Sequence, residues 1–563
     1  MYRGLEGAEF ADGISVAIRD PLRPNERVIS NKLLAAGNSS SMFGQRGHNL
    51  LWTFFGQFVS HDMGMNARNE TDDAVFSTPD TNIDAILIPI IEPDDPLPPT
   101  VRVESRKYRI RTLRSLGVIV NGQFEIYSDA TPFLDLGPLY GLNAQHADAL
   151  RAFTSGKLIT KDYVNAFSSV IGVNATNTVY DWMPTVADTH INTSRVVDLN
   201  QPDGKCFSTG DPRANENIGL LVIHSIFLRE HNRRAAELAL EHPEWTDEQL
   251  YQRARDWTIA IYQHIVFDEY LPAVLGPYVN RLKPYSRYDP DVDPRMSVTF
   301  SSAAFRFGHS TLPTLLYLKD RCDQPPFSGT DAVRNTRRGA GQNGGPTSGF
   351  DLMVQVGDPT NVLHAMLYNV AQKIDHLFED SLRNIANVPF DVIAVNILRG
   401  RHNGVPNYYK LRKTYTNLDI YQNGLCAANE TTPGPDPIEC FNLITSNSTL
   451  SGLLQYYYGK VNNIDAFVGM ISENRYLSAL GPTAAAISVD QFGRAREGDR
   501  FWYENLANGL FTPNEVAWVQ RETNFKYLIE RAYPSAHVQM APFFAPEDPD
   551  DFFADCQKGD YKK

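Results

Sequence analysis

Residues 246–265 read TDEQLYQRARDWTIAIYQHI. Thr246 and Gln249 stand three residues apart, as in a capping box, where the two side chains bond each other's backbone N–H at a helix start. Apolar side chains then recur every three or four residues, at Leu250, Ala254, Trp257, Ile261 and Ile265. Because this spacing matches the helical turn, it gathers them on one face. The stretch predicts one long amphipathic helix.

Helical periodicity extends to both sides of this stretch. It runs through Leu220, Ile223, Phe227 and His231, and through Leu363, Met366, Leu367, Val370, Ile374 and Leu377. Strand-like alternation is brief. Segments rich in Pro, Gly, Asn and Asp separate the helices, at 91–100, 285–295, 324–347 and 427–439. We therefore predict a single large domain over residues 1–563, mainly α, with long loops and little β structure.

The composition narrows the function classes. The 563 residues include 52 Lys+Arg and 66 Asp+Glu, so the formal charge is −14, which argues against a partner such as nucleic acid. The 42% hydrophobic residues suffice for a large core, which excludes disorder of the whole chain. No apolar run reaches the roughly 18 residues of a membrane-spanning helix, so no transmembrane segment is predicted.

Cysteines and sequons bear on the compartment. The five cysteines show no CxxC zinc spacing, and Cys426 and Cys440 could close a local loop, although the sequence does not specify which cysteines pair. Six Asn-x-Ser/Thr sequons occur, at Asn38, Asn69, Asn174, Asn192, Asn429 and Asn447. A chain of this length gives several sequons by chance, yet together these features favour a glycoprotein that is secreted or held in a secretory vesicle.

A polar pair interrupts an apolar segment at residues 51–63, which read LWTFFGQFVSHDM. Gln57 and His61 are four residues apart and share a face if the segment is helical. A buried polar group without a partner costs about 1–3 kcal/mol. The pair is therefore either a core histidine bonded to its glutamine or part of a site that faces a ligand.

A second histidine, His309, stands among small and aromatic residues in SAAFRFGHSTLP, residues 302–313. This setting suits an axial haem ligand and also a buried structural imidazole. Asn396 lies in AVNILRGRHNGVP, residues 394–406. An asparagine near a ligand histidine can fix its tautomer, and Arg399 can pair with a carboxylate such as a propionate, or lie in a solvated turn.

Two further segments are rich in polar groups. Residues 210–217, GDPRANEN, place Arg213 and Glu216 three apart, just before a helix expected to begin near Ile218. The alternative is an acidic helix N-terminus with a capping role. Residues 129–140 alternate oxygen donors in a pattern that could wrap a hard cation, although it fits no EF-hand.

These five segments occur in the order of a known family. The sequence resembles the animal-type haem peroxidases of the peroxidase–cyclooxygenase superfamily, from about Ala11 to about Ala541, and a short polar C-terminal tail follows. Residues 490–492 and 508–511 also look like that family. The resemblance implies one large helical peroxidase domain that binds haem b.

The resemblance also implies roles around the haem. Gln57 and His61 match the distal glutamine and histidine, and Arg213 matches the distal catalytic arginine. His309 matches the proximal iron ligand and Asn396 its hydrogen-bond partner. Glu216 matches the glutamate that forms an ester with a haem methyl, and Arg306 and Arg399 are expected beside the haem.

A calcium site adjoins the distal helix in this family. The matching residues are Asp62, Thr131, Phe133 through its carbonyl, Asp135 and Gly137. Gly137 replaces a serine ligand, which leaves a backbone carbonyl or water to complete the shell. Two other departures concern the haem: Ser60 replaces an aspartate that forms a second ester, and Asn217 replaces the methionine of the chlorinating member. At most one ester and little chloride oxidation are therefore expected.

The implied function is reduction of hydrogen peroxide with oxidation of iodide, bromide, thiocyanate, phenols or tyrosyl groups. One alternative is a haem fatty-acid dioxygenase of the same superfamily. Such enzymes carry a tyrosine three residues before the proximal histidine, where this chain has Arg306, yet residues 134–141, LDLGPLYG, resemble fungal dioxygenases. The other alternative is a non-catalytic peroxidase-like module for adhesion or interaction, against which His61, Arg213 and His309 together argue.

Overall fold

A computed structural model describes residues 3, 8–19, 22–36, 47–67, 85–91, 95–96, 109–113, 115, 117–120, 123–163, 179–189, 206–313, 315–317, 333–335, 359–384 and 391–546. Some predicted features lie outside these residues: the sequons at Asn38, Asn69, Asn174 and Asn192, the cysteines Cys322 and Cys556, and the tail at 547–563.

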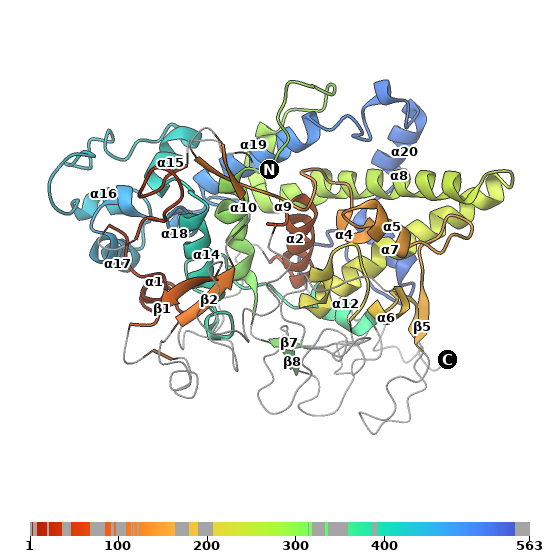
Figure 1. Cartoon of the computed structure of the whole chain (residues 1–563), viewed down its shortest axis with the longest axis horizontal. Coiled ribbons are helices and arrows are strands. Elements are labelled where there is room, and N and C mark those ends of the chain that lie inside the picture. The colour runs from red at the N-terminus through yellow and green to blue at the C-terminus, as the bar shows by residue number, and fades with distance from the viewer. Residues whose placement is uncertain are drawn as a thin grey trace.

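The described chain is mainly helical, as predicted (Figure 1). Its α-helices are α1 (Glu26–Lys32), α2 (Leu50–Met63), α4 (Gly137–Tyr140), α5 (Ala144–Ala149), α6 (Val186–Thr189), α7 (Ile218–Glu241), α8 (Asp247–Ile265), α9 (Leu271–Leu275), α10 (Val298–Ser302), α12 (Pro359–Tyr368), α13 (Asp380–Arg383), α14 (Val392–His402), α15 (Tyr408–Thr416), α16 (Ile438–Asn442), α17 (Ser448–Tyr458), α18 (Ala466–Ser472), α19 (Pro482–Glu497), α20 (Pro513–Glu522) and α21 (Phe525–Ala532). The 3₁₀ helices are η2 (Pro212–Glu216), η4 (Gly276–Arg281), η5 (Ala304–Thr311), η7 (Val461–Asn463) and η8 (Leu506–Asn508), and η3 (Val266–Tyr270) is a π-helix.

Strands within this part of the chain form four antiparallel pairs. The pairs are β1 (Ala85–Pro89) with β2 (Arg109–Leu113), β3 (Gly117–Val120) with β4 (Gln123–Ile126), β5 (Lys161–Tyr163) with β6 (Val179–Trp182), and β7 (Leu315–Tyr317) with β8 (Val333–Asn335). In the first pair Ile88 stands opposite Ile110. Two-stranded pairs do not build a layer of their own, so helix packing makes the core.

The core is centred on α2, which lies in the middle of the molecule with α7 and α8 extending to one side (Figure 1). Helices α7 and α12 pack against α2. Phe58 of α2 and Tyr262 of α8 both contact the ring of Phe227 on α7, each with centroids 5.4 Å apart. Burial of such large aromatic side chains supplies much of the stabilisation of a helical core.

The predicted amphipathic helix is confirmed as α8. Thr246 caps it and forms the capping box with Gln249, and Leu250, Ala254 and Ile261 are buried. Beyond Ile265 the chain continues without a break through η3 and α9. The helix expected to begin near Ile218 is α7, which starts at that residue.

The periodicity at 363–377 predicted too long a helix, because α12 ends at Tyr368. The backbone of the following residues bonds to the start of α2 instead: Leu50 N–H donates to the Asn369 carbonyl at 3.0 Å, and Ala371 N–H donates to the His48 carbonyl at 2.8 Å. Ile374 is nevertheless buried. Its apolar spacing therefore reported burial, and tertiary hydrogen bonds decided where the helix stops.

The N-terminus of α2 is anchored by the fully buried Asn49. Its side-chain oxygen accepts the Trp52 N–H, and its amide donates to the carbonyls of Leu367, Pro542 and Phe544 at 3.0, 2.8 and 3.1 Å. These groups come from segments more than 300 residues apart from Asn49. Asn49 therefore fixes the position of α2, which carries His61 near its other end, relative to α12 and to residues 542–544.

Buried ion pairs hold both ends of α14. Asp391, its N-cap, lies 2.5 Å from the guanidinium of Arg27. Arg401, near the C-terminus of α14, donates to the two oxygens of Asp465 at 2.9 and 2.7 Å and to Glu26 at 3.0 Å. All five side chains are buried, so α14 is fixed along its length.

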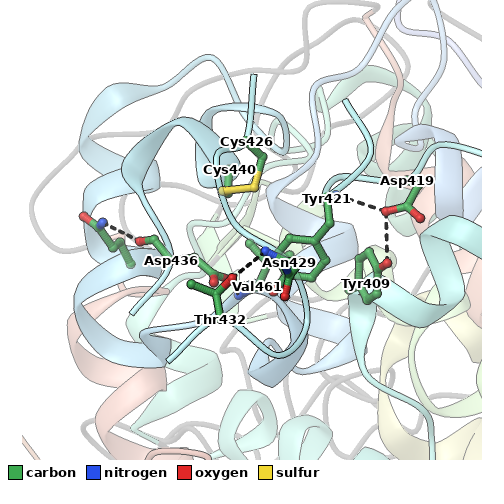
Figure 2. The surroundings of a disulfide bond; sticks show 10 residues. Tyr409, Asp419, Tyr421, Cys426, Asn429, Thr432, Asp436, Cys440 and Val461 are labelled. Atoms are coloured by element: carbon green, nitrogen blue, oxygen red, sulfur yellow. Dashed lines mark hydrogen bonds between the residues drawn. A yellow bond between two sulfur atoms is a disulfide. The ribbon is translucent and has the colours of Figure 1, made fainter. Parts of the chain in front are cut away.

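The predicted local loop is closed by a disulfide between Cys426 and Cys440 (Figure 2). Hydrogen bonds also hold this loop, because Asp436 accepts the Tyr421 hydroxyl at 2.6 Å and the Val461 N–H at 2.8 Å.

Among the described helices, none combines the length and the apolar character needed to cross a membrane.

Candidate active site

His61 and Gln57 lie one turn apart near the C-terminus of α2. Gln57 does not bond to His61: its amide nitrogen donates to the Glu216 carboxylate at 2.9 Å, and its oxygen accepts from the Asn217 amide at 2.9 Å. The His61 Nε2 atom is 3.9 Å from the same Glu216 oxygen. The pair is therefore part of a polar cluster that η2 completes, and the interpretation as a self-satisfied core pair is wrong.

Burial controls the charge of His61. Desolvation, and then the nearby guanidinium of Arg213, hold the pKa of His61 well below its ordinary value of 6.5. Its Nδ1 atom is buried and has no hydrogen-bond partner among the residues that the structure describes. The imidazole is therefore neutral at neutral pH, which is the form that can accept a proton.

Arg213 is held by a residue that the sequence analysis did not single out, Asp211. The Arg213 Nε donates to both Asp211 oxygens at 3.0 Å, and its Nη2 lies 2.5 Å from one of them. Burial by itself would raise the pKa of Asp211, but the charge and hydrogen bonds of Arg213 lower it to about 2. The sequence signal for this role is an aspartate two residues before Arg213, at the N-cap position that Asp211 occupies in η2.

The second histidine of the predicted site, His309 of η5, lies within hydrogen-bond distance of Asn396 of α14. The Asn396 Nδ2 and His309 Nδ1 atoms are 2.8 Å apart, and the Arg306 Nη1 donates to the Asn396 Oδ1 at 3.3 Å. Because Oδ1 accepts from Arg306, the amide nitrogen faces His309 and donates to Nδ1. The tautomer that ligates a metal through Nε2 carries its proton on Nδ1, and it requires the Asn396 amide to be turned over. The predicted pairing of His309 with Asn396 is present.

The two histidines stand on elements that pack together. Thr53 of α2 and Thr311 of η5 share a hydrogen bond of 2.9 Å between their hydroxyls, and α2 and η5 are in contact. The charge of Arg306 also contributes to lowering the pKa of His61. The segments at 51–63 and 302–313 therefore pack against each other, although they are far apart in sequence.

Space beside His309 is compatible with a flat prosthetic group. Gly308 is half-buried, and a side-chain carbon at that position would meet no atom of the described residues within 4 Å. An imidazole with its second nitrogen bonded to an asparagine is a suitable donor for haem iron. Arg399 lies half-buried on α14, one turn beyond Asn396. These residues fit haem.

The predicted calcium ligands also come together. Gly137 N–H donates to Asp62 at 2.8 Å and to Asp135 at 3.1 Å, and the Thr131 hydroxyl donates to Asp135 at 2.8 Å. Burial raises the pKa of both carboxyls, and the Asp135 charge adds to this for Asp62, which has a buried oxygen without a partner among the described residues. A buried carboxyl beside a half-buried one suits a bound cation. Phe133 lies half-buried in the same loop.

Two features limit the calcium site. The Gly137 carbonyl already accepts the Gly141 N–H at 2.9 Å within α4. In the described part of the chain, no three His, Cys, Asp or Glu side chains converge in the manner of a metal site. A cation would thus depend on two carboxylates, a hydroxyl and backbone or water oxygens, so calcium stays a prediction.

Comparison with known proteins places the chain in a family. It matches the family described as animal haem peroxidase over residues 1–543. It is 29% identical over 560 residues to peroxidasin homolog pxn-2 of Caenorhabditis elegans, a match that covers 95% of this chain but only 39% of that protein. It is 30% identical over 575 residues to lactoperoxidase of Homo sapiens, covering 98% of this chain and 75% of that protein.

Solved structures share the fold. Peroxidase A from Dictyostelium discoideum superposes with a TM-score of 0.75 at 24% identity and covers 96% of this chain and 95% of its own. A fatty acid alpha-dioxygenase of Arabidopsis thaliana gives a TM-score of 0.65 at 18% identity, with coverage of 94% and 79%. The predicted fold class and the resemblance seen in the sequence are confirmed, and the chain belongs to the animal haem peroxidase family.

Proposed function

We propose that this chain is an enzyme that uses haem b to reduce hydrogen peroxide and to oxidise small donors. One arrangement carries the proposal: His309, beside Asn396, lies on an element packed against α2, and the last turn of α2 holds His61 and is bonded to Arg213 of η2. We also propose that residues 1–563 form one peroxidase domain with its core at about 11–541, and the family match over residues 1–543 supports this.

His309 would hold the haem iron through Nε2 while its Nδ1–H donates to the oxygen of the turned-over Asn396 amide, which increases the electron donation of the imidazole. Bound haem would supply the iron at which peroxide is split and from which oxidising equivalents pass to a donor. Arg306 and Arg399 are the cations that we expect near its propionates, because guanidinium groups pair well with carboxylates.

His61 would move the proton. As a buried neutral base it takes the proton from one peroxide oxygen and returns it to the departing oxygen. Arg213 stabilises the negative charge that develops on that oxygen, and a cation already held in place needs no reorganisation during the step. Gln57, fixed by Glu216 and Asn217, orients water or a halide next to them.

The departures from the family pattern shape the donor range. Ser60 offers no carboxylate, so Glu216 is the one side chain of this pair that can form a haem ester. Asn217 bonds to Gln57 where the chlorinating member has a methionine. We therefore propose iodide, bromide, thiocyanate, phenols and tyrosyl groups as donors rather than chloride.

We propose calcium for the site formed by Asp62, Asp135 and Thr131. A divalent cation there would neutralise the buried carboxylate of Asp62, the residue after His61, together with the carboxylate of Asp135, and would thus stabilise the end of α2.

We propose that the protein acts in a secreted or vesicular compartment. The Cys426–Cys440 disulfide is typical of oxidising compartments. The sequon asparagines Asn429 and Asn447 are both exposed, as a glycan requires.

A fatty-acid dioxygenase is the main alternative, since the fold is shared with one. Against it, the residue three before His309 is Arg306, which bonds to the Ser301 carbonyl at 2.8 Å and to Asn396. An arginine cannot supply the tyrosyl radical expected at that position.

One experiment separates these functions. Purified protein supplied with haem should show a Soret band and oxidise a phenol only when peroxide is added. His309→Ala should lose the band, whereas His61→Ala should keep it and react with peroxide about 10²- to 10⁴-fold more slowly. A wild-type rate in His61→Ala would refute the assigned role. Oxygen uptake with linoleate would favour the dioxygenase, and neither signal would favour a non-catalytic module.

A further inference from the structure

Asp211 is completely buried, and its carboxylate holds the guanidinium of Arg213. We propose that Asp211 is a positioning residue, which fixes Arg213 and, through it, the last turn of α2 that carries His61. This inference rests on the proposed function for its catalytic consequence, but its structural part stands on contacts alone.

The contact between the two side chains is two-pronged. Arg213 Nε donates to Oδ1 and Oδ2 of Asp211 at 3.0 Å each, and Nη2 reaches Oδ2 at 2.5 Å. Two parallel bonds to a planar carboxylate define the plane of the guanidinium as well as its distance. A single charge–charge contact would leave the side chain free to rotate.

The guanidinium also bonds to the end of α2, through Nη1 and through the same Nη2 atom that reaches Asp211. Nη2 donates to the His61 carbonyl at 3.0 Å and to the Gly64 carbonyl at 3.2 Å, and Nη1 donates to Gly64 at 3.3 Å. The last carbonyls of a helix have no partner inside it and carry partial negative charge. Arg213 therefore acts as a C-terminal cap of the helix whose last turn holds His61.

Asp211 can hold Arg213 in place because hydrogen bonds fix the backbone of Asp211 itself. Its N–H donates to the Pro138 carbonyl at 3.0 Å, and its carbonyl accepts the Thr209 hydroxyl at 2.6 Å. Its Oδ1 also accepts the Arg213 N–H at 2.8 Å. A side-chain carbon on Gly210 would collide with the backbone of Gly137 and Gly141, so only glycine allows this approach. Helix α4 and its C-cap Gly141 thus locate Asp211 and, through it, Arg213.

A purely structural role for Asp211 predicts something different from a positioning role. A helix cap that merely stabilises the fold would weaken the protein by the same amount whether or not Arg213 is present. A residue that acts through Arg213 has no further effect once Arg213 is gone. A double-mutant cycle of Asp211→Asn and Arg213→Ala separates the two.

The first measurement uses the haem-free protein. Hydrogen exchange of the peptide that ends α2 should become about tenfold faster in Asp211→Asn and in Arg213→Ala, and no faster in the double variant than in Arg213→Ala. Asp465→Asn is the matched control, because Asp465 is likewise buried and paired with an arginine, Arg401. This control should leave the exchange at α2 unchanged.

The second measurement uses the haem-loaded protein. Asp211→Asn should slow the reaction with peroxide about 10- to 100-fold, and by less than about twofold in the Arg213→Ala background. Arg213→Lys keeps the charge but cannot form the two-pronged pair, so it should resemble Asp211→Asn. If Asp211→Asn does not fold, Arg213→Lys replaces it in this measurement.

Equal effects of Asp211→Asn on exchange with and without Arg213 would overturn the inference, whatever the peroxide reaction does. A wild-type peroxide rate in Asp211→Asn would overturn the positioning role. A loaded wild type that ignores peroxide would refute the proposed function instead, and the exchange cycle would then decide the inference alone.

Discussion

The bond between Asn396 and His309 gives the most direct test of the proposal that His309 holds the haem iron. Asn396→Ala removes an amide that lies 2.8 Å from His309 Nδ1. A buried polar atom that loses its partner costs about 1–3 kcal/mol, and each 1.4 kcal/mol is a factor of ten in affinity. Because His309 is half-buried, water can replace part of the bond. We expect the affinity for haem to fall about tenfold.

The assay is a titration of haem into haem-free protein, followed by the Soret band and completed before any peroxide is added. Asn403→Ala is the matched control. Asn403 is a buried asparagine at the end of the same helix and donates to the Ser302 hydroxyl at 3.0 Å. Both variants lose a buried hydrogen bond near η5, but only Asn396→Ala alters the bond to His309.

Asn396→Asp probes the same bond with a stronger acceptor. A carboxylate would draw the Nδ1 proton of His309 and make the imidazole a stronger donor, so the reduction potential of bound haem should become lower than in the wild type. If Asn396→Ala bound haem as tightly as Asn403→Ala, and Asn396→Asp left the potential unchanged, His309 would not be the iron ligand.

Three further outcomes are expected. Glu216→Gln should make the haem extractable by acidified organic solvent after exposure to peroxide, and extraction of wild-type haem under the same conditions would exclude the ester. The pKa of Asp211 is depressed from 3.8 to about 2 in the folded state, so its pairing with Arg213 stabilises the protein above pH 3.8. The unfolding free energy that the wild type gains over Asp211→Asn should shrink by about 2 kcal/mol as the pH falls to about 2, and a gap independent of pH would contradict this. Replacing Cys426 and Cys440 together by serine should lower the unfolding free energy by about 3 kcal/mol in denaturant titrations, since the disulfide closes a loop with a sequence separation of 14; no loss would mean that the loop is held by its hydrogen bonds alone.

The sequence by itself determined the helices that depend on short-range signals, and it identified the residues that make up the proposed site. The capping box and apolar spacing at 246–265 predicted α8, since both depend on neighbours within one or two turns. The order of the segments containing His61, Arg213, His309 and Asn396 identified the family. Such signals can be read from a linear sequence because each is contained in a short stretch of chain.

Tertiary structure decided what the side chains bond to. Gln57 is four residues from His61, yet it bonds to Glu216, which is 159 residues away. The helix predicted to reach Leu377 stops at Tyr368, because the backbone that follows bonds to the start of α2. The periodicity of a segment reports which side chains are buried. Hydrogen-bond partners far along the chain depend instead on how the helices pack, and no spacing within a segment encodes that.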